Sequence, residues 1–239
     1  MKTKLILLAA MAAMLSVGFA SCSKDDDNSG SSNNGNSGNG GGDNTEWVDL
    51  GLPSGLLWAK CNVGASSPED YGNYYAWGET TTKSDYSWET YAYGNSSTTL
   101  TKYCSKTDNG FNGFTDALTT LQSSDDAVTA VFGNGARIPT KDEWDELLNN
   151  CTEEWVSQNG VNGCKFTASN GNTLFLPAAG YCDGSELRGV SRYGDYWSSS
   201  LYTDEPNCAW DFYIGSYGTI MGNDSRYYGL SVRAVRPAI

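Results

Sequence analysis

Tyrosine dominates the segment from residue 193 to residue 228. Seven tyrosines fall within it, interspersed with aspartate, serine, asparagine and arginine. This mixture is typical of antibody paratopes, because a tyrosine ring offers a large amphipathic contact area at little cost in rotamer entropy. Its faces also suit stacking on sugar rings. We therefore predict non-covalent binding of an external glycan or protein; the alternative is a tyrosine-rich sheet surface without a ligand. The predicted ligand-binding residues are Tyr193, Tyr202, Asp211, Tyr213, Ser216, Tyr217, Asn223, Asp224, Arg226 and Tyr227.

A second candidate chemistry is calcium coordination. The tripeptide Glu205-Pro206-Asn207 resembles the one with which mannose-type C-type lectins bind Ca²⁺ and sugar hydroxyls. Carboxylate and amide oxygens suit this hard cation. The same residues are common in ordinary turns, and no Trp-Asn-Asp motif accompanies them. We expect no cofactor, and calcium near Glu205 and Asn207 is the alternative.

Catalysis has little support in the sequence. The chain has no histidine, which excludes Ser-His-Asp and Cys-His catalysis and the usual zinc sites. Adjacent carboxylates recur at 142–143, 145–146 and 153–154, but glycosidase chemistry needs two carboxyl groups that face each other across a cleft. We expect no enzymatic activity. Arg137, Arg233 and Arg236 favour structural ion pairs over clamping a ligand carboxylate.

The charge of the chain excludes one class of partner. Acidic residues number 28 and basic residues 15, giving a net charge of −13. Nucleic-acid binding depends on clusters of lysine and arginine that displace counterions from phosphates. We therefore expect no nucleic-acid partner.

The first 45 residues carry targeting signals. Lys2 and Lys4 precede an apolar run at 5–20, which is shorter than the roughly 20 residues of a membrane span and is typical of a secretory signal peptide. Cys22 follows small residues, as in the bacterial lipobox, where the cysteine becomes the lipid-modified N-terminus. The alternative is ordinary signal cleavage nearby.

The residues after Cys22 predict display on a flexible tether. Aspartates 25–27 resemble the surface-export signal of Bacteroidetes lipoproteins, although they also fit a solvated charge run. Segment 28–42 contains only Asn, Ser and Gly, so it cannot bury enough apolar area to offset its ordering entropy. We predict a signal peptide at 1–21, a lipid anchor and linker at 22–45, and one domain at 46–239. The predicted location is the outer membrane, at the cell surface.

Six cysteines follow in the predicted domain. An even number favours disulfides in an exported protein, and six cysteines allow 15 pairings; buried free thiols are the alternative. A turn at 159–163 would place Cys164 opposite about position 157, out of bridging distance of Cys151. The six are Cys61, Cys104, Cys151, Cys164, Cys182 and Cys208.

Two helices and several strands are predicted to position these residues. Thr140 and Glu143 form a capping box before apolar residues at 144, 147 and 148, which predicts a helix over 140–150. A second helix is predicted over 125–132, ended by Gly133. Five tryptophans are predicted to be core residues, namely Trp58, Trp77, Trp144, Trp197 and Trp210.

Strands are predicted at 55–63, 207–215 and 229–236, with a hairpin of 164–168 and 173–177. A type I′ turn at Asn170-Gly171 would set Phe166 opposite Phe175. In 207–215, alternation places Trp210, Phe212 and Ile214 on one face and Asp211 and Tyr213 on the other.

Seven segments together resemble a known family. They are Trp47–Leu52, Leu57–Gly64, Tyr74–Glu79, Arg137–Trp144, Phe175–Tyr181, Tyr196–Ser200 and Ser231–Pro237. In combination they resemble the Fibrobacter succinogenes major paralogous domain of Bacteroidetes lipoproteins, over residues 46–238. That group is similar in fold to C-type-lectin-like domains of the formylglycine-generating-enzyme type. The resemblance implies an α+β fold: a single C-type-lectin-like domain with small twisted antiparallel sheets, about two helices and long loops. It implies no reaction.

The resemblance leaves other roles open. Formylglycine-generating enzymes hold copper with two cysteines near the C-terminus; here Cys182 and Cys208 are the only cysteines after residue 179, and neither lies in a resembling segment. A disulfide or buried thiols are favoured there. The C-terminal composition also resembles the variable region of retroelement-diversified receptors. The alternatives to ligand binding are therefore an adhesion or assembly component of the envelope and a diversified receptor-like protein.

Overall fold

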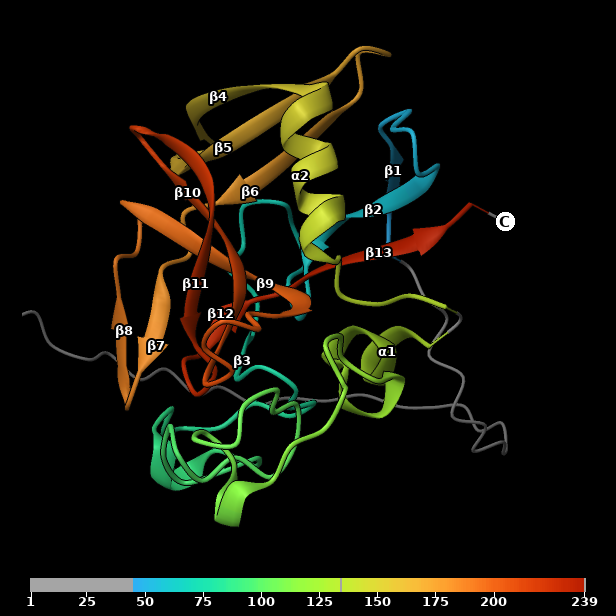
Figure 1. Ribbon diagram of the computed structural model, residues 1–239. Helices are drawn as coiled ribbons and strands as arrows, with labels where there is room; N and C mark the ends of the chain where they lie inside the picture. The colour runs from blue at the N-terminus through green and yellow to red at the C-terminus, as the bar shows by residue number, and fades with distance from the viewer. Residues whose placement is uncertain (1–44, 134, 239) are drawn as a thin grey trace, which may run out of the picture. The chain divides into compact units, whose positions relative to one another are not determined.

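The computed structural model describes residues 45–133 and 135–238 (Figure 1). The predicted signal peptide, the lipid anchor Cys22 and nearly all of the linker lie outside the described residues. The described chain is α+β, as the sequence predicts, with small, mostly antiparallel sheets, two α-helices and long loops. Among the described residues, no helix combines the length and apolar character that crossing a membrane requires.

The largest sheet, which we call the central sheet, has five strands in the order β11-β10-β9-β12-β3. Its pairings are antiparallel except for β12 with β9. Register between β9 and β10 shifts between Ala209 and Asp211. The strands are β3 (Tyr74–Tyr75), β9 (Tyr193–Leu201), β10 (Cys208–Gly215), β11 (Gly218–Ser225) and β12 (Leu230–Ser231).

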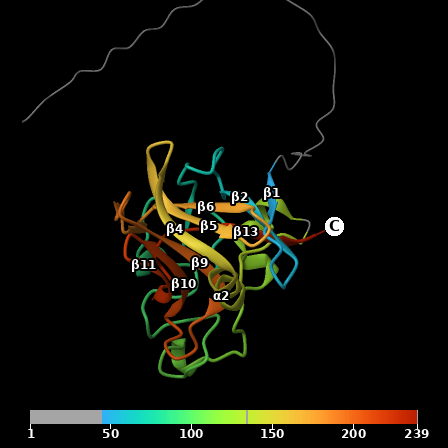
Figure 2. The same cartoon turned by 90° about the horizontal axis from the view of Figure 1, so that it is seen from above.

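Three smaller sheets surround it. The first has the order β1-β2-β13, the second β4-β5-β6, and the third is the hairpin β7-β8. Figure 2 shows β6 running alongside β2. Their bounds are β1 (Trp47–Asp49), β2 (Leu56–Asn62), β4 (Cys151–Gln158), β5 (Val161–Ala168), β6 (Thr173–Pro177), β7 (Tyr181–Asp183), β8 (Glu186–Arg188) and β13 (Arg233–Pro237).

Helix α2 (Lys141–Asn150) anchors the core against the central sheet. It begins as predicted, with the Thr140 hydroxyl accepting from the Glu143 amide and the Glu143 carboxylate accepting from the Thr140 amide. The capping box directs the apolar stripe inward, where the Trp144 ring stacks on Phe212 with centroids 4.6 Å apart. Four of the five predicted core tryptophans are buried; Trp210 is only partly so.

Helix α1 (Ala127–Phe132) starts two residues later than predicted. Asp126 caps it by accepting from the amides of Val128 and Thr129, and Gly133 ends it with φ of +57°. Residues 123–125 form a 3₁₀ turn instead. Further 3₁₀ turns at Trp88–Thr90 and Phe111–Gly113 lie in the long irregular segment between β3 and α1, which gathers below the central sheet in Figure 1.

The predicted pairing of Phe166 with Phe175 is wrong by one residue. Phe166 lies opposite Leu174, and Phe175 lies opposite Lys165. Ala168 pairs with Asn172, so the loop has three residues and its last, Gly171, has φ of +86°. A three-residue loop with a left-handed glycine shifts the register relative to a two-residue type I′ turn.

The predicted strand 229–236 is divided between two sheets. Leu230 and Ser231 pair in the central sheet, while Arg233 onward pairs with β2. The break holds Arg233 inside the molecule, where its guanidinium donates to the carbonyls of Ala59 and Phe175 and to Asn62 Oδ1. One buried side chain thereby links the β1-β2-β13 sheet to the β4-β5-β6 sheet.

Candidate functional site

Strand alternation divides the predicted binding residues between two faces of the central sheet. Tyr193, Asp211, Tyr213 and Asp224 occupy one face, since β9, β10 and β11 pair in a register that aligns them. Asn223 lies opposite Trp210 on the other face, where Tyr202 also packs edge-on against the Trp210 ring. The ten residues therefore do not form one surface.

The face that bears Tyr213 carries an unbroken series of aromatic rings, which we call the aromatic row. Neighbouring ring centroids along it lie 4.5–6.3 Å apart. All of the rings are partly exposed. Hairpin β7-β8 contributes Tyr181 and stands beside the central sheet in Figure 1. In spatial order the row is Tyr213, Tyr193, Tyr181, Tyr228, Tyr227 and Trp88.

Glycines make room for the first two rings of the row. A Cβ on Gly189, which has φ of +72°, would lie 2.1 Å from the Tyr193 ring, and one on Gly215 would lie 2.6 Å from the Tyr213 hydroxyl. Burial raises the pKa of both phenols. Both hydroxyls are therefore protonated at neutral pH.

The row ends in a depression of about 410 Å³, which we call the tyrosine hollow. Tyr217, fully exposed at the β10-β11 turn, stands on its rim. Four predicted residues meet here: Tyr193, Tyr213, Ser216 and Tyr217. Lining residues that the sequence analysis did not single out are Trp155, Asn162, Ser191 and Arg192.

Three carboxylates lie on the same face of the central sheet, one on each of three neighbouring strands. Asp195 is on β9, Asp211 on β10 and Asp224 on β11, and one oxygen of each lies within 4.8 Å of the others. Only 5% of Asp195 and 3% of Asp211 is exposed, while Asp224 is partly exposed. We call them the carboxylate trio.

Burial and mutual repulsion perturb the trio. Burial, followed by the charge of Asp224, raises the pKa of Asp195 to about 8. The same two causes, with the charge of Asp195, raise the pKa of Asp211 well above its ordinary value. Burial also raises the pKa of Asp224. An unpaired buried carboxylate is costly, so the trio must hold either protons or a cation.

The prediction that Arg226 contacts a ligand is corrected by its position. The side chain is wholly buried, and its guanidinium donates to the Tyr91 hydroxyl and to the carbonyls of Tyr103 and Pro206. It also lies over the Trp77 ring. These contacts leave it out of reach of an external ligand, and Arg226 has a structural role.

The Glu205-Pro206-Asn207 turn offers little to calcium. Asn207 Oδ1 accepts from Asn109 Nδ2, and the Pro206 carbonyl accepts from Arg226. The one group of at least three acidic, cysteine or histidine side chains in the described ranges that are near enough to share an ion is the carboxylate trio, which does not include Glu205.

All six cysteines of the domain are free thiols, so no disulfide joins them in the described ranges. Cys164 lies opposite Trp155, two residues from the expected position, and Cys151 lies opposite Ala168, which agrees with the expectation that these two cannot bridge. Burial raises the pKa of Cys182 and Cys208 to about 11, which disfavours the thiolates that Cu(I) would need.

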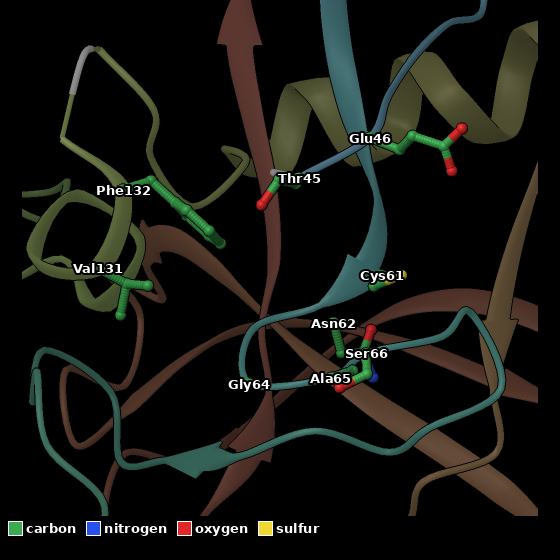
Figure 3. A pocket seen from close by; sticks show the side chains of 9 residues that line it. All are labelled: Thr45, Glu46, Cys61, Asn62, Gly64, Ala65, Ser66, Val131 and Phe132. Atoms are coloured by element: carbon green, nitrogen blue, oxygen red, sulfur yellow. The ribbon is translucent and has the colours of Figure 1, made fainter. Parts of the chain in front are cut away.

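Another cavity, of about 490 Å³, has a lining that includes no residue of the aromatic row (Figure 3). It opens between the end of β2 and the end of α1, with Val131 and Phe132 on one wall and Cys61 near the other. Glu46 on its rim is paired with Lys60, and Asn62 binds Arg233. It therefore gathers few unengaged polar groups, and the tyrosine hollow is the better candidate site.

Only weak sequence signals point to the residues that were missed. Asp195 sits between Tyr193 and Trp197 at a spacing of two, which indicates a shared strand face. Tyr181 and Trp88 come from distant segments, so only tertiary structure brings them to the row.

Comparisons of the chain with family models, with curated proteins and with solved structures find no match in any of the three.

Proposed function

We propose that the chain is an exported, lipid-anchored envelope protein whose domain binds an external ligand, a polysaccharide chain being the best fit. The observation that carries the proposal is the aromatic row, six partly exposed rings in continuous contact that end in the tyrosine hollow. No covalent chemistry is required.

Three features favour a glycan. Ring faces and edges suit the apolar faces of sugars, and the protonated phenols supply hydrogen bonds beside them. Ser216 and Asn162 at the hollow can donate and accept. The net charge of −13 disfavours anionic ligands and fits a neutral polysaccharide.

The test uses the full chain in detergent on an array of immobilised plant, microbial and host polysaccharides. We expect binding to at least one class, weakened about tenfold or more by Tyr213→Ala or Tyr217→Ala, since each removes a stacking surface. Tyr202→Ala is the matched control, because it removes a partly buried tyrosine on the opposite face. Equal losses in all three variants, or binding to no polysaccharide, would refute the glycan assignment.

A protein ligand is the second possibility. Ile220, which lies opposite Tyr213 in register, is exposed beside the row and adds an apolar group that a protein partner would cover. If the chain binds no polysaccharide on the array but captures a protein partner, and the tyrosine variants weaken that capture, the adhesion or assembly role replaces the glycan role. We also propose that the domain is related to the Fibrobacter succinogenes major paralogous domain and has a C-type-lectin-like fold. A relation to diversified receptors is a further proposal.

The anchor is tested separately. Cys22→Ser should leave the chain without lipid, so that it no longer sediments with membranes or incorporates labelled palmitate. Retention of the variant in the membrane fraction would disprove the anchor without affecting the binding proposal.

A further inference from the structure

Other buried or partly buried acids of the described chain are offset by a basic side chain or by backbone amides, and the carboxylate trio is not paired with a basic side chain. Asp125 pairs with Lys102, and Glu143 pairs with Arg137. Asp126 accepts three backbone amides, from Val128, Thr129 and Ile138. No salt bridge within residues 45–133 and 135–238 includes a member of the trio.

One oxygen of the trio is orphaned. Asp211 Oδ1 is inaccessible to solvent and has no hydrogen-bond partner in the described structure. Asp211 is 97% buried, and its carboxylate lies within reach of the other two. A buried acceptor without a donor costs about 1–3 kcal/mol, and more when it is charged. The orphaned oxygen can therefore accept a proton or coordinate a cation.

The backbone reserves space for this oxygen. Gly222 lies directly opposite Asp211 in the β10-β11 register, and a Cβ there would come within 2.9 Å of Asp211 Oδ1. Any larger residue at 222 would displace the carboxylate. Figure 1 shows β9, β10 and β11 side by side, so the trio spans three adjacent strands of a rigid sheet.

We propose that Asp195, Asp211 and Asp224 together bind one divalent cation of the calcium class. All ligands are hard carboxylate oxygens, which suit Ca²⁺ rather than the nitrogen and sulfur ligands preferred by zinc. Two oxygens that bind the same Ca²⁺ at about 2.4 Å can be at most about 4.8 Å apart, and no pair of the trio's ligand oxygens exceeds this separation. Asp224, partly exposed, supplies the route of entry.

The site lies next to the aromatic row but does not depend on its function. The charge of Asp195 acts on Tyr193 and Tyr213, and that of Asp224 acts on Tyr181 and Tyr228. A bound cation would neutralise two charges beneath these rings and fix the strands that carry them. Cation binding is measurable without any knowledge of the external ligand.

The test is titration of the full chain in detergent with CaCl₂ up to the millimolar range that extracellular sites require, by calorimetry and thermal unfolding. Tb³⁺ is a second probe, because it replaces Ca²⁺ at oxygen sites and emits when a nearby indole is excited. Trp197 lies opposite Asp211 in the β9-β10 register. We expect one equivalent of Ca²⁺, a rise in Tm, and Tb³⁺ emission that Ca²⁺ abolishes.

Variants locate the cation. Asp211→Asn and Asp195→Asn should weaken Ca²⁺ affinity about tenfold or more, and Gly222→Ala should weaken it by displacing the Asp211 carboxylate. Glu205→Gln is the control, because it makes the same change in charge at the turn that resembles a lectin calcium motif. If a buried variant fails to fold, Asp224→Asn at the rim replaces it.

Three results would overturn the proposal. First, a wild-type chain that neither binds Ca²⁺ nor rises in Tm at millimolar concentration would mean that the trio holds only shared protons. Second, binding unchanged in the folded Asp211 and Asp224 variants would place the cation elsewhere. Third, loss of binding in Glu205→Gln alone would assign it to the turn. None of these results depends on whether a polysaccharide binds.

Discussion

The guanidinium of Arg137 holds the carboxylate of Glu143 through two hydrogen bonds, from Nη1 to Oε2 at 2.7 Å and from Nη2 to Oε1 at 2.5 Å. The Thr140 amide donates to the same Oε2 at 2.8 Å. Burial raises the pKa of the Glu143 carboxyl, but these hydrogen bonds and the charge of Arg137 outweigh it, so the pKa lies below its ordinary value.

This pair predicts a pH dependence of stability. Because the folded-state pKa of Glu143 is lowered, its contribution is complete above the unfolded-state pKa and is lost as pH falls through the folded-state value. Glu143→Gln should therefore lower the free energy of unfolding by about 1 kcal/mol at pH 7 and by progressively less below about pH 4. Urea unfolding over a pH series measures this.

A surface pair on the same helix provides the control. Asp145 pairs with Lys141 at the i, i+4 spacing, where both side chains are partly exposed, so Asp145→Asn should cost only about 0.3–0.5 kcal/mol. If Glu143→Gln lowers the free energy of unfolding no more than Asp145→Asn does, or by the same amount in acid, the bidentate pair adds nothing to the stability of the helix cap.

The buried position of Arg226 predicts a stability effect rather than a binding effect. Arg226→Met leaves the Tyr103 and Pro206 carbonyls and the Tyr91 hydroxyl without their donor, so it should cost about 3–5 kcal/mol. Arg226→Lys should also destabilise, because an ammonium cannot reproduce the planar fork. Arg192→Met, at an exposed arginine of the tyrosine hollow, should change stability by less than about 0.5 kcal/mol. Denaturant unfolding distinguishes the two.

Two tyrosines of the predicted site should differ in their contribution to stability. Tyr217 is fully exposed, so Tyr217→Ala should leave Tm nearly unchanged. Tyr227 packs against Trp88 and Tyr228, so Tyr227→Ala should lower the free energy of unfolding by about 1–2 kcal/mol. Calorimetric scans of both variants decide this; a loss at Tyr217 would show that its ring packs against the domain.

The free cysteines predict slow alkylation. Burial raises the pKa of all six thiols of the domain, and the thiolate is the reactive form. The folded chain should react slowly with iodoacetamide at neutral pH, and the six should react fully once it is unfolded without reductant. Mass spectrometry counts the labels. Resistance of a pair in the unfolded chain would reveal a disulfide.

Local signals predicted the parts of the fold that depend on neighbouring residues. The capping box of Thr140 and Glu143 placed α2 correctly, since both partners lie within one turn. The hairpin register failed because one added loop residue before Gly171 shifts every pair behind it. The division of the last predicted strand at Val232 could not be foreseen, because it depends on β2 and on the buried Arg233.

The candidate site shows the same limit. Alternation correctly put Asp211 and Tyr213 on the face opposite Phe212 and Ile214, but it could not say which neighbouring strands would join them. Asp195 and Asp224 meet Asp211 only through the order β11-β10-β9. Tyr181 reaches the row through hairpin β7-β8, which precedes β9, and Trp88 reaches it from a segment far away in the sequence.

The bond from Arg233 Nε to Asn62 Oδ1 spans 171 residues of chain. Strand β2 is made early and exposes Trp58 and Ala59 until β13 arrives to pair with it. Because the chain is synthesised from its N-terminus, β1 and β2 are made long before β13. The β1-β2-β13 sheet therefore cannot be completed until β13 has been made, and folding of the N-terminal strands depends on this late segment.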